Sequence, residues 1–137
     1  MIQTNFFKGT VMEPEKKKVL IVEDDTSLRK ALAEKLLYEG FAVCEAENGV
    51  VGLEVALREH PDIILLDVVM PKMDGLTMLS KLREDSWGKI AQVIMLTNVN
   101  DGESVLKSLD QAAFDYLIKS DWKLEDIVKK IRERLDR

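Results

Sequence analysis

The chain has 137 residues, of which 25 are acidic and 20 are basic, so its formal net charge is −5. That length holds one domain with a sizeable core, and the negative charge disfavours a protein that binds duplex nucleic acid through a basic face. No apolar run reaches the ~18 residues that cross a membrane, the amino terminus lacks a secretory signal, and the single Cys44 fits a reducing cytoplasm.

Residues 1–17 show no helical or strand period and contain Gly9 and Pro14, which predicts a flexible N-terminal tail ahead of one domain over residues 18–137. Beyond the tail, short apolar runs alternate with amphipathic stretches. Short apolar runs bounded by turn signals are typical of buried parallel strands. We predict strands at 18–23, 41–45, 62–66, 90–96 and 114–118, and helices at 27–39, 49–58, 75–84, 102–111 and 123–136. Gly40 should end the first helix, and Asn48 and Asp121 should cap the second and fifth.

Five strand–helix units predict an α/β fold, (βα)5, with a doubly wound five-stranded parallel sheet in the flavodoxin-like order 2-1-3-4-5. Polar residues follow four of the strands at their carboxyl ends, where such sheets bind ligands. They are Glu23 and Asp24, Asp67, Thr97, and Lys119. Three carboxylates suit Mg²⁺, and a carboxylate beside a metal can attack phosphorus. Lys119 could hold the incoming phosphoryl group, and Thr97 could donate its hydroxyl to a phosphoryl oxygen.

These residues lie in motifs that resemble the receiver domain of two-component response regulators, over about Lys18–Leu135. The resemblance is carried by the stretches VLIVEDD, IILLDVVMPKMDG, MLTN and DYLIKS. It implies that Asp67 accepts a phosphoryl group from a sensor histidine kinase or a phosphotransfer protein. It also implies that Mg²⁺ is held by Glu23, Asp24, Asp67 and the main-chain carbonyl of Val69.

The resemblance further implies a switch, in which Thr97 moves toward the phosphoryl group and Tyr116 turns into the vacated space. A downstream protein would then bind the face made by the fourth helix, the fifth strand and the fifth helix. We expect a cytoplasmic monomer or weak homodimer with no nucleic-acid or membrane partner. We do not expect an enzyme: its chemistry would be limited to its own phosphotransfer and slow dephosphorylation.

One departure from the family pattern and one pair of apolar side chains near the site lead to further predictions. Ser120 stands where the family usually has proline, and we predict a trans Lys119–Ser120 bond because a cis bond before a non-proline residue costs about 2.5–4 kcal/mol. The side chains two residues after Asp67 and Thr97 are valines, Val69 and Val99, which cannot hold a water by hydrogen bonding. The aspartyl phosphate should therefore be long-lived.

The sequence leaves alternatives to a stand-alone receiver open. The chain could be the receiver portion of a longer response regulator, or an unphosphorylated pseudo-receiver that only docks. A metal-dependent phosphatase of related fold would normally need a second acidic residue at the position of Val69. Outside these motifs, we expect Cys44 to pack in the core and His60 to lie on the surface.

Overall fold

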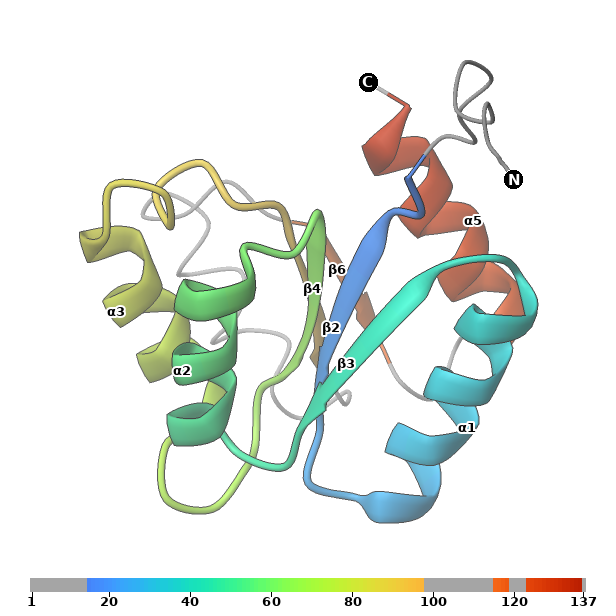
Figure 1. Ribbon diagram of the computed structural model, residues 1–137. Coiled ribbons are helices and arrows are strands. Elements are labelled where there is room, and N and C mark those ends of the chain that lie inside the picture. Colours follow the sequence, from blue (N-terminus) through green and yellow to red (C-terminus); the bar gives the residue numbers. More distant parts are fainter. Residues whose placement is uncertain (1–14, 98–114, 119–122, 137) are drawn as a thin grey trace, which may run out of the picture.

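The structure, a computed structural model, describes residues 15–97, 115–118 and 123–136. Within these ranges five parallel strands form one sheet in the order β3-β2-β4-β5-β6 (Figure 1). The strands are β2 (Lys18–Val22), β3 (Ala42–Ala46), β4 (Ile63–Asp67), β5 (Val93–Thr97) and β6 (Asp115–Ile118). This is the predicted 2-1-3-4-5 order of a flavodoxin-like sheet. The first and third strands of the chain lie side by side at its switch point.

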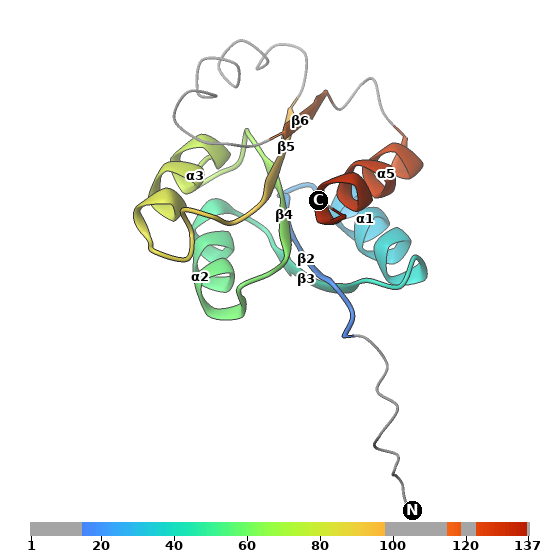
Figure 2. The ribbon, with the colours of Figure 1, turned by 90° about the horizontal axis from the view of Figure 1, so that it is seen from above.

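The described helices are α1 (Thr26–Tyr38), α2 (Gly49–Glu59), α3 (Gly75–Glu84) and α5 (Leu124–Leu135). Figure 2 shows α2 and α3 covering one face of the sheet and α1 and α5 covering the other. Alternate residues of β2 supply the two cores: Leu20 and Val22 pack toward α2 and α3, whereas Val19 and Ile21 pack toward α1 and α5. The strands β2, β4 and β5 are thus buried on both faces, which explains their continuous apolar runs.

Side-chain caps begin three of the helices. The N–H groups of Leu28, Val51 and Thr77 donate to the side chains of Asp25 (3.1 Å), Asn48 (2.9 Å) and Asp74 (2.7 Å). The predicted cap Asn48 is confirmed, and Gly40 follows α1 with a positive φ of 96° that glycine adopts readily.

The predicted cap of the fifth helix is wrong. Asp121 lies outside the described residues, and the cap position of α5 is Lys123, whose N–H donates to Asp126 at 2.7 Å. The acidic side chain of Asp126, in the first turn of the helix, thus accepts the N–H of the cap residue. The helix therefore starts later than an aspartate cap at 121 would place it.

The fourth strand is also shorter than predicted, because β5 begins at Val93 rather than at residue 90. The Asp85 carboxylate accepts the N–H groups of Trp87 and Gly88 at 3.0 and 2.9 Å. Arg83 donates to the carbonyls of Gly88 and Ala91 at 2.6 and 2.7 Å. These bonds hold the backbone of residues 87–91 in a turn ahead of β5.

Parts of the sequence prediction fall outside the described residues. They include the fourth helix at 102–111, the Lys119–Ser120 bond and residues 1–14 of the predicted tail. Residues 15–17 are exposed and carry no regular secondary structure. Among the helices that are described, none combines the length and apolar character required to cross a membrane.

Candidate metal centre

Three carboxylates meet at the carboxyl ends of β2 and β4. Val22 pairs with Leu66 in the sheet, so the next residues along the two strands, Glu23 and Asp67, are brought side by side. One carboxylate oxygen from each of Glu23, Asp24 and Asp67 lies within 4.8 Å of the others. Glu23 is fully buried and Asp67 is 4% exposed, whereas Asp24 is open to solvent. The three predicted acidic ligands thus form one cluster that reaches solvent at Asp24.

Backbone hydrogen bonds hold both strand ends in place. The N–H of Glu23 donates to the Ala46 carbonyl of β3 at 3.0 Å, and the Glu23 carboxylate accepts the N–H of Asp25 at 3.1 Å. On the other strand, the N–H of Val68 donates to the Leu96 carbonyl of β5 at 3.1 Å. The cluster is therefore built on the most buried strands of the sheet, which limits how far the carboxylates can separate.

The start of α3 packs directly against the phosphoacceptor candidate. The N–H of Gly75 donates to the Val68 carbonyl at 2.8 Å, and a side chain at Gly75 would overlap the backbone carbonyl of Asp67. Gly75 belongs to the motif that suggested the site, but its contact with Asp67 was not predicted. The contact joins residues eight positions apart across a turn, and its only sequence signal is the absence of a side chain.

The donor set fits a hard divalent cation. Mg²⁺ prefers oxygen ligands and usually takes one or two carboxylates together with waters. Three clustered carboxylates repel one another, so a cation between them would relieve this repulsion. The residue assigned as a main-chain ligand, Val69, follows Asp67 by two positions with a 55%-exposed side chain. Its carbonyl remains a predicted ligand.

The other predicted site residues are placed only in part. Thr97 ends β5 one residue beyond Leu96, the register partner of Asp67, so its backbone lies at the same sheet edge. Tyr116 lies in β6 and pairs with Met95 of β5. Lys119 follows Ile118, the last residue of β6, in the sequence. Lys119 and the side chains of Thr97 and Tyr116 lie outside what the structure describes. Their roles therefore remain predictions.

Cys44 packs against the core without being fully buried, and His60 lies on the surface as predicted. Cys44 is half-buried, and this burial raises the pKa of its thiol, which lowers the thiolate fraction at neutral pH. His60 is exposed at the end of α2 and stacks on Trp87, with ring centroids 4.2 Å apart. Neither residue belongs to the acidic cluster.

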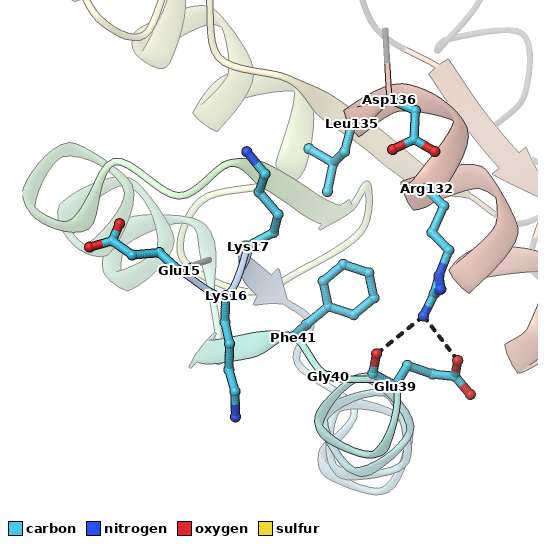
Figure 3. A pocket seen from close by; sticks show the side chains of 9 residues that line it. All are labelled: Glu15, Lys16, Lys17, Glu39, Gly40, Phe41, Arg132, Leu135 and Asp136. Carbon is cyan, nitrogen blue, oxygen red and sulfur yellow. Dashed lines mark hydrogen bonds and ion pairs between the residues drawn. The ribbon is translucent and has the colours of Figure 1, made fainter. Parts of the chain in front are cut away.

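A hollow of about 590 Å³ lies at the opposite end of the sheet, where β2 and β3 begin (Figure 3). Arg132 of α5 spans its rim: the guanidinium donates to the carbonyl and carboxylate of Glu39 at 3.1 and 3.0 Å and lies over the Phe41 ring. Side chains of both charge signs line the hollow. It is separate from the acidic cluster, and its contacts tie the end of α5 to the turn after α1.

The comparisons with known proteins agree with the fold. Residues 19–132 match the response regulator receiver domain. The response regulator MprA of Mycobacterium leprae is 37% identical over 120 residues, covering 88% of this chain and 51% of that protein. A probable transcriptional regulator, ycf27 of Porphyridium aerugineum, is 34% identical over 125 residues, covering 90% of this chain and 51% of that protein.

Among solved structures, a CheY-like response regulator receiver domain protein from Methanospirillum hungatei superposes with a TM-score of 0.80. It is 30% identical, and the match covers 89% of this chain and 95% of that one. The chain therefore belongs to the response regulator receiver domain family and has its flavodoxin-like α/β fold. It spans about half the length of the curated relatives that it matches.

Proposed function

We propose that this receiver domain is a phosphorylation-controlled signalling switch in which Asp67 is the phosphoacceptor. The observation that carries the proposal is the position of Asp67. It lies 4% exposed at a strand end, with the carboxylates of Glu23 and Asp24 within 4.8 Å. A carboxylate oxygen of Asp67 would attack the phosphorus of a phosphohistidine on a sensor kinase or phosphotransfer protein. The P–N bond breaks, the histidine nitrogen takes up a proton, and an acyl phosphate remains on Asp67.

Bound Mg²⁺ would offset the negative charge that gathers as the phosphoryl group approaches. Glu23, Asp24, Asp67 and the Val69 carbonyl are the residues that would hold the ion. Lys119 and Thr97 would bind the phosphoryl oxygens. Their positions in the sequence motifs that resemble the family support this assignment. These residues would serve this domain's own phosphotransfer and slow dephosphorylation, and no separate substrate is proposed.

The output would be a change in the surface formed by residues 102–111, β6 and α5. A phosphoryl group adds about −1.5 to −2 charge and strong acceptor oxygens, which would draw the Thr97 hydroxyl toward Asp67 and let Tyr116 follow. A downstream protein would bind this face of a cytoplasmic monomer or weak homodimer. Such a switch needs two conformations that are already close in free energy.

A longer response regulator is the second candidate, because the curated relatives are about twice as long as the matched region and include a probable transcriptional regulator. In that case, any contact with DNA would belong to a second domain. The predicted absence of a nucleic-acid partner applies to this receiver chain alone, which has a net charge of −5 over its 137 residues.

Replacing Asp67 with asparagine tests the phosphoacceptor. Asparagine keeps the shape of the side chain but removes the nucleophilic carboxylate, so we expect labelling by a small phosphodonor with Mg²⁺ to be lost. The label would be located by mass spectrometry of peptides. Asp62→Asn is a matched control, because Asp62 lies at the opposite end of β4, where its carboxylate accepts the Lys18 N–H at 2.7 Å. Labelling of Asp67→Asn at the wild-type level, with the same sites mapped, would contradict the assignment.

Replacing Val69 with asparagine tests the lifetime of the acyl phosphate. The exposed Val69 side chain cannot orient a water, whereas an amide can accept or donate a hydrogen bond. One hydrogen bond of ~1 kcal/mol to the attacking water would speed hydrolysis about fivefold. The measurement is the decay of phosphorylated protein in Mg²⁺, with the apolar Val69→Leu as control. Equal decay rates for the two variants would show that this position does not control the lifetime.

A further inference from the structure

A buried arginine binds the main chain of one of the acidic residues. Arg29, on the first half of α1, is 9% exposed. Its Nη1 donates to the main-chain carbonyl of Glu23 at 2.8 Å, and its Nε donates to a carboxylate oxygen of Glu45 on β3 at 3.1 Å. One side chain therefore joins a helix to the ends of two neighbouring strands.

The contact with Glu23 completes the turn that carries two of the acidic ligands. The β2 ladder ends where Val22 pairs with Ala46 and Leu66, and the Glu23 N–H makes one more bond to the Ala46 carbonyl. The Glu23 carbonyl then accepts from Arg29. Both backbone polar groups of Glu23 are thereby held, one by β3 and one by α1, and the carboxylate projects from a fixed peptide.

The position of Arg29 is itself set by a second residue. The Glu45 side chain is 28% exposed, and its carboxylate accepts hydrogen bonds from Arg29 at 3.1 Å and from Lys30 at 3.3 Å. An arginine fork can reach the Glu45 carboxylate and the Glu23 carbonyl together, whereas a lysine ammonium is a single point of charge on a flexible stem. The geometry therefore favours arginine specifically at position 29. Lys30, with a side chain that is 63% exposed, contributes only to the Glu45 pair.

We propose that Arg29 is a positioning residue for the metal centre, fixing the turn over Glu23–Asp25 so that the carboxylates of Glu23 and Asp24 face Asp67. Glu45 holds Arg29 in this role. The inference rests on the proposed function, because it assumes that Mg²⁺ binds at these carboxylates. Residues that orient metal ligands without touching the ion typically change metal affinity 10–100-fold when they are replaced.

A merely structural arginine would stabilise the fold without changing how the folded protein binds Mg²⁺. The two roles separate when affinity is measured at a temperature where every variant is fully folded. Val128→Ala provides a matched destabilised control, because Val128 is a buried core residue on α5 and not part of the acidic cluster. It should unfold more easily than the wild type and still bind Mg²⁺ with the same affinity.

The experiment compares Arg29→Met, Arg29→Lys, Glu45→Gln and Lys30→Gln by calorimetric Mg²⁺ titration. Amide chemical shifts of Glu23–Asp25 are recorded without metal. We expect Arg29→Met to weaken Mg²⁺ binding ~10-fold or more and to shift these amides before any metal is added. Arg29→Lys should restore part of the affinity, and Glu45→Gln should weaken binding less than Arg29→Met. Lys30→Gln should bind like the wild type.

The proposal is overturned if Arg29→Met, or Arg29→Lys should the methionine variant not fold, binds Mg²⁺ like Val128→Ala and leaves the amides of residues 23–25 unshifted. If the wild type binds Mg²⁺ and is labelled at Asp67 while Arg29 has no effect, only this inference fails. If the wild type neither binds Mg²⁺ nor is labelled at Asp67, the proposed function fails and takes the inference with it.

Discussion

Replacing Gly75 with alanine is expected to destabilise the protein by ~3 kcal/mol and to displace the backbone of Asp67. A methyl group at position 75 would overlap the Asp67 carbonyl oxygen and lie 3.1 Å from the Val68 Cα. The helix start cannot simply retreat, because the Gly75 N–H donates to the Val68 carbonyl at 2.8 Å. Overpacking an interior costs about 1–3 kcal/mol, and here the obstacle is main chain rather than a flexible side chain, which favours the upper end.

The expected loss of stability in Gly75→Ala is opposite in sign to the effect of helix propensity. Gly75 is the first residue of α3, and helix propensity alone predicts that alanine would stabilise the protein by up to ~1 kcal/mol. Urea unfolding gives the free energy, and labelling by a phosphodonor reports on Asp67.

Gly40→Ala is the control, because Gly40 has a positive φ of 96° and no neighbour within 4 Å of an added Cβ. It should cost only the ~1–2 kcal/mol of a left-handed backbone and leave labelling intact. A Gly75→Ala variant that is as stable and as readily labelled as the wild type would contradict the prediction.

Replacing Asp24 with asparagine is expected to raise the free energy of unfolding in EDTA and to remove the stabilisation by Mg²⁺. Two unit charges ~5 Å apart repel by roughly 3 kcal/mol at an effective dielectric constant of ~20. Asp24 is exposed, so solvent screening should reduce the gain from removing its charge to about 1 kcal/mol. The wild type should recover the difference when the metal binds, by ~1.4 kcal/mol at ten times its dissociation constant.

Thermal unfolding in EDTA and over a series of Mg²⁺ concentrations measures both effects. Asp62→Asn removes the same charge at the far end of β4 and should keep the Mg²⁺-dependent rise in melting temperature. If Asp24→Asn were less stable than the wild type in EDTA and equally stabilised by Mg²⁺, the metal would bind elsewhere.

The amino-acid sequence by itself determined the alternation of strands and helices and the edge at which the acidic residues meet. The run Ile63–Leu66 is apolar at every position because β4 lies in mid-sheet with helices on both faces. Such a run can be recognised in the sequence without the structure. Glu23, Asp24 and Asp67 were predictable for the same reason: each follows such a run, and parallel strands bring their carboxyl ends to one edge. Local capping chemistry also identified Asn48.

Only the tertiary structure decided which distant groups support that edge. Arg29 lies on the buried face of α1 with Leu32, Ala33 and Leu36. The residues around it in the sequence do not predict that it binds the Glu23 carbonyl and Glu45. Gly75 likewise needs the folded turn to meet Asp67. The spacing of apolar residues predicts which side of a helix or strand is buried, because that spacing follows the period of the element itself. Partners far apart in the chain depend on strand register and on how a helix crosses the sheet, and these are settled only when the whole core packs.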